Sequence, residues 1–579
     1  MNKFAVFHVS DTPWAYAKDE TTLTLRIRTA FADLTRVTVH YKDRYDWSGS
    51  GCAEQLKKIA DVGLFTYWSC DISLSRSRFR YFFELEDTTG EIACYDEGGW
   101  HSLEEGFMEE RAFQYAYIGK ADLYLGREVL QEAIVYQIFP ERFHNSDPSN
   151  DPKNREMWGG IPGRYTSFGG DLRGITQKLD YLADLGITLL YLTPVFMASS
   201  NHKYNIQDYF KIDPQFGTLE DAKELVRRAH ELNIKVFFDA VFNHTGSDFF
   251  AFIDVLKHQA GSQYASWYHI DSFPVRFAQS NYYTFATMIS TMPKLRTENP
   301  KVRDYFFDVG RYWIREIGID GWRLDVCDEV DHAFWQGFRR ACLEENPKAA
   351  LVGEIMHESS AFLKGNELDS IMNYPFKFAV TDFFAHRATT VKEFMDSLAA
   401  NRVIYMEPIT RQLWNLLDSH DTPRFLTSAK GQRDRLMLAA AFQFLYIGTP
   451  YIYYGDEIGL DGGDDPYCRR CMPWATADQD LELFHFFKAL IALRKSSLAF
   501  SIGSFQEISR QEHCIVFQRT HQGECYWCAF NNSDVSQSID MNAQNLREVT
   551  PVRSQGLIHQ DRIELGPMEY RVFKKEETH

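Results

Sequence analysis

The N-terminal part of the chain shows apolar and polar residues in alternation, with a period of two. Leu23, Leu25 and Ile27 form one such run, and polar residues stand between them. Because successive side chains of a β-strand point to opposite faces, this period predicts strands with one buried face. Turn residues separate several runs of this kind, so residues 1–122 are expected to form an N-terminal β-sandwich domain.

A different pattern begins near residue 130, where short apolar runs recur and helical patterns follow them. Thr218 is the expected N-cap of one helix, in which Ala222, Leu225 and Ala229 fall on one face. Strands that alternate with helices predict an α/β fold, a parallel (β/α)8 TIM barrel, over residues 123–504. The eight runs are Ala133 to Phe139, Ile187 to Pro194, Val236 to His244, Ile319 to Val326, Ala350 to Ile355, Ser370 to Tyr374, Leu413 to Asp418 and Tyr451 to Tyr454.

Two other segments depart from the barrel pattern. Residues 245–299, after the third strand-like run, carry few helix signals and many aromatic residues, so we expect a small inserted domain there. From residue 505 onward, runs such as Ile515 to Phe517 and Tyr570 to Phe573 again favour strands. Residues 505–579 are therefore expected to form a C-terminal β-sandwich.

Polar residues end several of the apolar strand-like runs. In a barrel of this kind, residues at the C-terminal ends of the strands face the active site, so these polar side chains are expected to meet at one rim. For any one of them, a structural salt bridge or a strand cap is the alternative. The residues are Asp239, Asn243, His244, Arg323, Asp325, Glu354, His420 and Asp421.

The carboxylates in this set suit glycoside hydrolysis. Arg323 and Asp325 are two residues apart, so in a strand they point to the same side. A guanidinium beside Asp325 is expected to keep it ionised, as a nucleophile requires. Glu354 is then the expected proton donor, if its surroundings raise its pKa. A retaining glycosidase uses such a pair at a separation of about 5–5.5 Å.

The order and spacing of these motifs resemble the four signature regions of the α-amylase family (glycoside hydrolase family 13). The matching segments are Asp239 to His244, Gly321 to Asp325, Gly353 to Ile355 and Leu417 to Asp421. The resemblance implies that Asp325 is the nucleophile, Glu354 the acid/base and Asp421 the transition-state stabiliser. It also implies a set of substrate-binding residues, namely His202, Tyr204, His244, Arg323, His420, Asp465 and Arg469.

Further motifs resemble the neopullulanase, cyclomaltodextrinase and maltogenic amylase group of that family. They are Met292 to Leu295, Glu329 to His332 and Gly455 to Gly459. The resemblance implies an α-glucan oligosaccharide substrate and a homodimer in which the N-terminal domain helps wall the partner's active site. The chain departs from the group at Arg296, at Cys327-Asp328 and at Met356, which stands where the group usually has Trp. Met356 is expected near the leaving-group side, and the alternative is core packing.

A second group of oxygen donors suits Ca²⁺, which takes 6–8 oxygen ligands. The resemblance implies a structural calcium ion here, held partly by a glycine carbonyl, whereas an Asx-rich turn without metal is the alternative. The proposed ligands are Asn145, Asp147, Asn150, Asp151, Gly169 and Asp171.

Composition narrows the function by exclusion. The formal net charge of −18 argues against nucleic acid or an anionic membrane as the main partner. No apolar run is long enough to span a membrane, and the first residues do not resemble a secretory signal, so a cytoplasmic location is expected.

Ten cysteines in 579 residues are too few for a disulfide scaffold. The pairs Cys468/Cys471 and Cys525/Cys528 suit reduced thiols better than a zinc site, because their separation is atypical.

The function expected from the sequence is therefore hydrolysis of α-1,4-glucosidic bonds in cyclodextrins, maltooligosaccharides and pullulan, with α-1,6 cleavage and transglycosylation as further activities. A dedicated glucanotransferase or a maltose isomerase would use the same three carboxylates. A catalytically silent binding relative is a different class, and it usually lacks part of this triad, whereas Asp325, Glu354 and Asp421 are all present.

Overall fold

The structure is a computed structural model that describes residues 1–47, 51–105, 107, 110–287, 289–540, 545–551 and 561–576. The chain divides into two compact units. The first comprises Met1–Gly126, Leu363–Gly365 and Lys392–Thr410, and the second comprises Arg127–Phe362, Asn366–Val391 and Arg411–His579.

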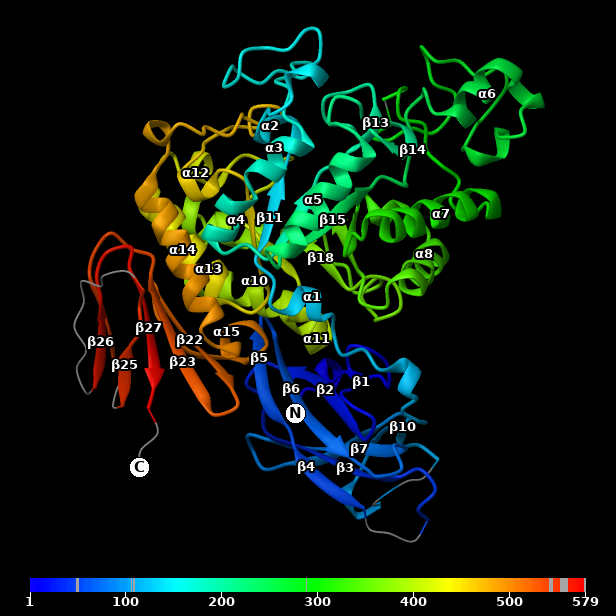
Figure 1. Cartoon of the computed structure of the whole chain (residues 1–579). Helices are drawn as coiled ribbons and strands as arrows, with labels where there is room; N and C mark the ends of the chain where they lie inside the picture. The colour runs from blue at the N-terminus through cyan, green and yellow to red at the C-terminus, as the bar shows by residue number, and fades with distance from the viewer. Residues whose placement is uncertain are drawn as a thin grey trace. The chain divides into compact units, whose positions relative to one another are not determined.

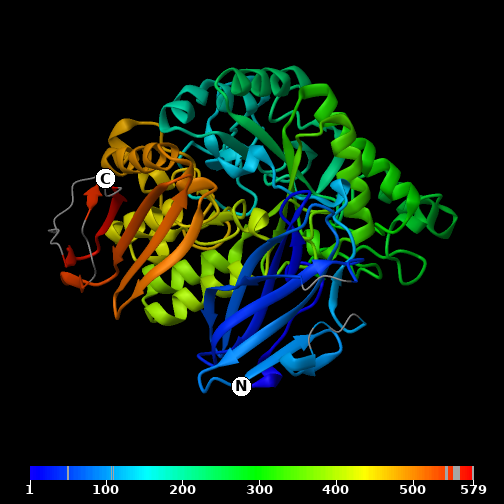
Figure 2. The same cartoon turned by 90° about the horizontal axis from the view of Figure 1, so that it is seen from below.

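The N-terminal residues of the first unit form antiparallel sheets around an apolar core (Figure 2). A sheet of order β1-β2-β6-β5 and a sheet of order β4-β3-β7-β8-β9, with β10 paired to β7, both contribute to this core. Leu23, Leu25 and Ile27 lie in the core, as the period of two predicts. The strands are β1 (Ala15–Ala17), β2 (Thr22–Ala30), β3 (Leu34–Asp43), β4 (Cys52–Gln55), β5 (Lys57–Val62), β6 (Phe65–Ser73), β7 (Phe79–Asp87), β8 (Ile92–Asp96), β9 (Gly99–His101) and β10 (Phe113–Tyr115).

Strand β2 is buried on both faces, although its alternation predicts a polar face in contact with water. The Nη1 atom of Arg26 donates to the carbonyl oxygens of Val403 at 3.0 Å and Tyr405 at 2.6 Å. Val403 is the last residue of helix α10 (Val391–Val403) and shares an apolar cluster with Ala60. A helix from a distant part of the chain therefore covers this face, and the contact cannot be read from local sequence.

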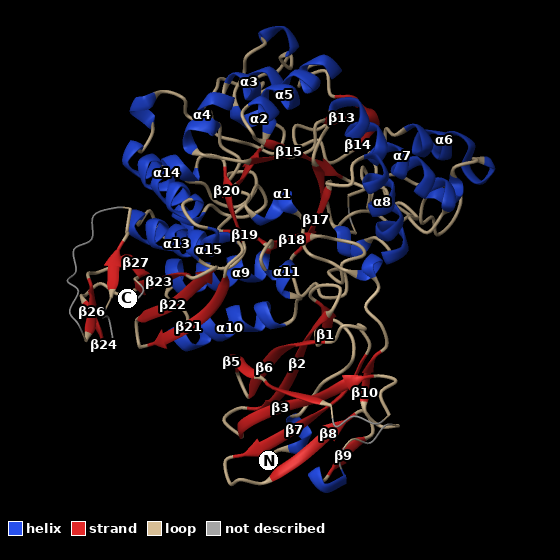
Figure 3. Ribbon diagram, turned by 60° about the horizontal axis from the view of Figure 1, so that its bottom comes forward, coloured by secondary structure: helices blue, strands red, loops and turns tan. Residues whose placement is uncertain are grey.

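The second unit contains the predicted barrel. Among the described residues, eight parallel strands close in the order β11-β12-β15-β16-β17-β18-β19-β20, and helices surround them (Figure 3). This confirms the TIM-barrel fold. The strands are β11 (Val135–Ile138), β12 (Leu189–Leu192), β15 (Lys235–Ala240), β16 (Gly321–Leu324), β17 (Ala350–Ile355), β18 (Ser370–Asn373), β19 (Trp414–Leu416) and β20 (Thr449–Tyr453).

Helix boundaries in this unit follow capping residues. Helix α5 (Leu219–Glu231) begins with a capping box between Thr218 and Asp221, which satisfies amide groups that lack partners in the first turn. The other principal helices are α2 (Pro140–Phe143), α3 (Leu172–Gln177), α4 (Leu179–Leu185), α7 (Pro300–Ile317), α8 (His332–Glu345), α9 (Tyr374–Val380), α13 (Arg433–Leu445) and α14 (Leu481–Lys495).

Two segments extend the barrel (Figure 1). Between β15 and α7 the chain forms helix α6 (Phe250–His258), 3-10 turns and isolated bridges such as Tyr268 to Leu295. After α14 a sheet of order β21-β22-β23-β27-β25 follows, and β24 pairs with β26. Their bounds are β21 (Ser504–Arg510), β22 (Cys514–His521), β23 (Glu524–Asn531), β24 (Gln537–Asp540), β25 (Leu546–Glu548), β26 (Arg562–Leu565) and β27 (Tyr570–Lys575). Within the described part of the chain, no helix is long and apolar enough to cross a membrane.

Candidate active site

The polar residues predicted at the strand ends meet at one rim of the barrel. Asp239 in β15 pairs in register with Arg323 in β16, and Glu354 lies near the end of the next strand, β17. Asp325 follows β16 directly. All four side chains are buried, so their charges interact with one another more strongly than they would in water.

Arg323 is the centre of this cluster. Its Nη1 atom donates to Asp325 Oδ1 at 2.9 Å and to Asp239 Oδ2 at 3.0 Å. Its Nη2 atom lies 2.5 Å from Glu354 Oε1. The main-chain N–H of Val326 donates to the other oxygen of Glu354 at 3.2 Å. One guanidinium thus holds three carboxyl groups together.

The sharing of Arg323 changes the expected ionisation. Burial raises the pKa of Asp325 well above its ordinary value, and the guanidinium offsets this only in part. Burial also raises the pKa of Glu354 to about 7. Burial thus outweighs the guanidinium that is expected to keep Asp325 ionised, because Asp239 and Glu354 share the same positive charge. At neutral pH the buried carboxyl groups retain a proton among them.

A hydrogen-bonded chain orders the aromatic side of the site. Gln137 Nε2 lies 2.7 Å from His420 Nδ1, and His420 Nε2 lies 2.6 Å from the Tyr204 hydroxyl. That hydroxyl donates to Asp239 at 3.0 Å. Burial lowers the pKa of His420 to about 3, so the ring is neutral. Because the Gln137 amide nitrogen can only donate, His420 Nδ1 accepts its hydrogen bond and the ring proton lies on Nε2. His420 and Tyr204 are consequently fixed in one orientation.

Asp421 is tied to the segment that follows β20. Its Oδ1 accepts from Arg469 Nη2 at 3.0 Å, and Arg469 Nη1 lies 2.9 Å from Asp465. Burial raises the pKa of Asp421, but His420 and Arg469 lower it more, so the net pKa lies below the ordinary value. Asp421 is thus ionised under conditions in which Glu354 keeps its proton.

The remaining predicted residues, His202 and His244, both contact Tyr204. The ring of His202 stacks near that of Tyr204, with centroids 5.9 Å apart, and His244 Nε2 lies 3.2 Å from the Tyr204 carbonyl oxygen. Burial lowers the pKa of both histidines to about 3. The structure therefore brings all the predicted catalytic and substrate-binding residues into one network.

Sequence reasoning missed residues that support this network. Gln137 lies in β11 and orients His420. In the sequence, its role is indicated by a polar residue inside an otherwise apolar strand. Lys203 lies between His202 and Tyr204 with φ of 62°, and its Nζ atom pairs with buried Asp213 at 2.9 Å. This buried ion pair fixes the loop that presents both rings. Lys203 stands between two predicted substrate-binding residues, whereas Asp213 lies outside every predicted motif.

The departures from the resembling group occupy different environments. Met356 is 46% exposed, so the alternative of core packing is wrong. Cys327 is buried, and its thiol lies 3.5 Å from the Glu354 carbonyl oxygen. Asp328 pairs with His357 at 2.9 Å, and Arg296 is partly exposed.

The predicted calcium loop brings the side chains of Asp151 and Asn145 close to Gly169. A Cβ on Gly169 would lie 2.3 Å from Asp151 Oδ1 and 2.6 Å from Asn145 Nδ2, so only glycine permits this approach. The buried Oδ1 atom of Asn150 has no hydrogen-bond partner. An unpartnered buried oxygen is costly without a ligand, so these residues fit a hard cation.

Four of the proposed side-chain ligands already have partners. Asn145 Nδ2 donates to Asp151 Oδ1 at 2.5 Å, and the other Asp151 oxygen pairs with Arg155 at 2.8 Å. Asp171 caps α3 by accepting from Gly174 N at 2.6 Å, and its other oxygen accepts from Ser146 N and Asp147 N. Asp147 pairs with Arg173 at 2.6 Å. In the described part of the chain, no group of three or more His, Cys, Asp or Glu side chains is arranged to hold a metal. The fit therefore depends most on the unpartnered Oδ1 atom of Asn150, together with Asn145, Asp151 and Gly169, which lie close to one another.

Comparisons with known proteins agree with this geometry. A family model described as alpha amylase, catalytic domain matches residues 137–503, and one described as alpha amylase, N-terminal ig-like domain matches residues 1–119. The chain is 44% identical to a cyclomaltodextrinase of Thermoanaerobacter pseudethanolicus, over 94% of each chain. It is 44% identical to neopullulanase 2 of Thermoactinomyces vulgaris, over 92% of each. The structural alignment with a solved cyclomaltodextrinase covers 100% of this chain and 100% of that chain, at 38% identity and with a TM-score of 0.94.

Proposed function

The chain belongs to the α-amylase family and is a glycoside hydrolase acting on α-glucans, and from this premise we propose that it cleaves α-1,4-glucosidic bonds in cyclodextrins, maltooligosaccharides and pullulan by a retaining mechanism. The observation that carries the proposal is the attachment of Asp325 and Glu354 to the same guanidinium at the barrel rim. A retaining mechanism needs two carboxyl groups about 5–5.5 Å apart.

In the proposed mechanism, a carboxylate oxygen of Asp325 attacks the anomeric carbon while Glu354 donates its proton to the departing glycosidic oxygen. The bond to the leaving sugar breaks, and a covalent glycosyl–enzyme ester forms. Glu354, now ionised, accepts a proton from water, and the resulting attack on the anomeric carbon releases the sugar and restores Asp325. The pKa of Glu354, raised by burial to about 7, supports its double role.

The other residues of the network bind the sugar at the cleavage point. We assign this role to His202, His244, Arg323 and His420, to Tyr204 as a stacking surface, and to Asp465 and Arg469. The neutral imidazoles suit an uncharged sugar, because a neutral ring can both donate and accept a hydrogen bond when substrate replaces one of its partners. Asp421 is the proposed stabiliser of positive charge in the transition state, since its pKa lies below the ordinary value.

The substrate is tested by incubating the enzyme with β-cyclodextrin, pullulan and soluble starch, with the products separated by chromatography. We expect opened and shortened maltooligosaccharides from the cyclodextrin and faster cleavage of it than of starch. Longer products built from maltotriose would instead favour a glucanotransferase, and conversion of maltose to an isomer would favour a maltose isomerase. No glucan cleavage by the folded protein would reject the proposal.

Two accessory properties, a calcium ion and a homodimer, belong to the same proposal. Calcium is held at Asn145, Asn150, Asp151 and the Gly169 carbonyl, with Asp147 and Asp171 ordering the loop or completing the shell. A homodimer forms through the N-terminal unit, where Tyr45 and Trp47 are 55% and 67% exposed. Sedimentation of the full chain tests the dimer, and a concentration-independent monomer mass would contradict it.

The proposed location is inside the cell. Each of the ten cysteines, all of which lie among the described residues, is a free thiol. Unpaired thiols in this number are typical of a reducing compartment. Detection of the protein in the culture medium rather than in the cell extract would contradict this location.

A further inference from the structure

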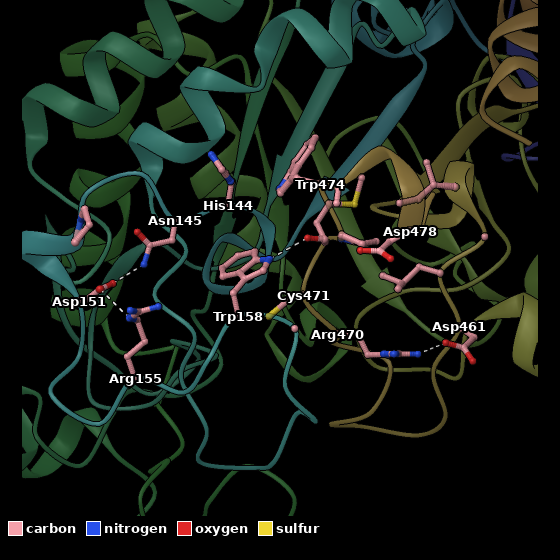
Figure 4. Close-up of a pocket in the computed structure, with 18 residues that line it drawn as sticks. His144, Asn145, Asp151, Arg155, Trp158, Asp461, Arg470, Cys471, Trp474 and Asp478 are labelled. Carbon is pink, nitrogen blue, oxygen red and sulfur yellow. Dashed lines mark hydrogen bonds and ion pairs between the residues drawn. The ribbon is translucent and has the colours of Figure 1, made fainter. Parts of the chain in front are cut away.

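A pocket of about 800 Å³ opens in the second unit, and no proposed catalytic residue lines it (Figure 4). One wall comes from the loop after α2, which carries Arg155 and Trp158. The other wall comes from the segment after β20, which carries Asp461, Arg470 and Asp478. The volume lies within the range of sites that bind small molecules, about 300–1,000 Å³.

An aromatic ring lies in the middle of this pocket. In Figure 4 the indole of Trp158 is placed between the Arg155 side and the Arg470 side. Its N–H donates to the Met472 carbonyl oxygen at 3.0 Å, which fixes the ring, and the residue is only partly buried. A fixed and accessible aromatic ring suits an apolar face such as the C–H face of a pyranose.

The charged groups around the ring form pairs. Arg155 lies 2.8 Å from Asp151, and Arg470 pairs with Asp461. Asp478 is exposed and adds a further carboxylate. Each arginine already has a carboxylate partner, so neither guanidinium is free to bind a phosphate or another anion. A neutral ligand with many hydroxyl groups would instead find donors and acceptors side by side.

We propose that this pocket is a second binding site for α-glucan, separate from the catalytic centre, in which a glucose unit packs on Trp158 and its hydroxyl groups bind the flanking Arg–Asp pairs. The choice of α-glucan rests on the proposed function. The site adjoins the segment from Asp465 to Arg469, because Arg470 follows it directly. Glucan held there stays on the enzyme while the catalytic site acts.

The pocket is distinguishable from the calcium loop, although the two share Asn145 and Asp151 as lining residues. Trp158, Arg470 and Asp478 are outside the proposed calcium ligands. Variants at these positions, assayed with saturating calcium, therefore report on the pocket alone.

The test is calorimetric titration of the Asp325→Asn enzyme with maltotetraose in calcium-containing buffer. We expect two sites per chain. Adding Trp158→Ala should remove one site or weaken it by about tenfold or more, since tryptophan contacts commonly dominate binding energy. Adding Asp478→Ala, an exposed change that should not disturb folding, should weaken the same site. Met157→Ala is the matched control, because Met157 is 82% exposed beside Trp158 and does not line the pocket.

Three outcomes decide the matter. A single site in the Asp325→Asn enzyme, unchanged by Trp158→Ala and by Asp478→Ala, would overturn the proposal. Binding of inorganic phosphate at Trp158 in place of maltotetraose would overturn the choice of a neutral sugar. Wild-type enzyme that fails to hydrolyse glucans yet binds maltotetraose through Trp158 would refute the proposed function and leave this site intact.

Discussion

The Nη2 atom of Arg323 lies 2.5 Å from the Oε1 atom of Glu354, so the proposed proton donor binds the same guanidinium as the proposed nucleophile. The Nη1 atom of Arg323 holds Asp325 at 2.9 Å. Substrate that enters between the two carboxyl groups must compete with their contacts to Arg323. The proton that the buried carboxyl groups retain is then the proton available for the leaving group.

The pH dependence follows from the raised pKa of Glu354. Burial raises this pKa to about 7, so Glu354 holds its proton below that pH and loses it above. We expect kcat/KM for β-cyclodextrin to fall as the pH rises through about 7. α-Maltosyl fluoride needs no proton on its leaving group, so its hydrolysis should lack this falling limb. A limb with the same midpoint for both substrates would exclude Glu354 as its origin.

Asp325→Asn should abolish turnover while substrate still binds. The amide keeps the shape of the side chain but cannot form the glycosyl ester, so we expect a loss of several orders of magnitude in kcat. Asp328→Asn is the matched control, because Asp328 lies three residues along the same loop and pairs with His357 rather than with Arg323. Retention of more than a few per cent of activity in Asp325→Asn would refute the assignment.

Much of the site was predictable because its residues lie in contiguous motifs at strand ends. The supporting contacts were not, since they join distant segments. Gln137 reaches His420 across the barrel, and nothing near Gln137 in the sequence indicates that partner. The shared use of Arg323 was hidden for the same reason. Spacing relates Arg323 to Asp325, whereas its approach to Asp239 and Glu354 depends on the register of neighbouring strands.

The fold shows the same division between local and distant effects. The strand runs and the Thr218 cap follow local patterns, and the structure has them where the sequence predicts. The second buried face of β2 arises because Arg26 binds carbonyl groups at the end of α10, about which the local alternation carries no information.

Calcium should stabilise the native state without changing the chemistry. A ligand that binds only the folded chain at about 100 times its Kd adds about 2.7 kcal/mol of stability. We expect a lower Tm in EDTA than in Ca²⁺, and loss of this difference in Asn150→Ala, which removes the unpartnered buried oxygen. Asn154→Ala, an exposed change in the same loop, should retain the difference. Equal melting of the wild-type enzyme in both buffers, with no metal by elemental analysis, would refute the site.

Met356→Trp should raise the ratio of transglycosylation to hydrolysis. Met356 lies two residues beyond Glu354 and is 46% exposed, so a larger side chain can be placed there without the overpacking that a buried site would suffer. Methionine is narrow and flexible, whereas tryptophan offers a broad rigid face on which an acceptor sugar can pack. A better-held acceptor competes with water for the glycosyl ester, while formation of that ester should change little. The measurement is the product pattern from maltotriose, with Met356→Leu as the control of similar size. A Met356→Trp enzyme with normal melting and an unchanged product pattern would show that this position does not contact the acceptor.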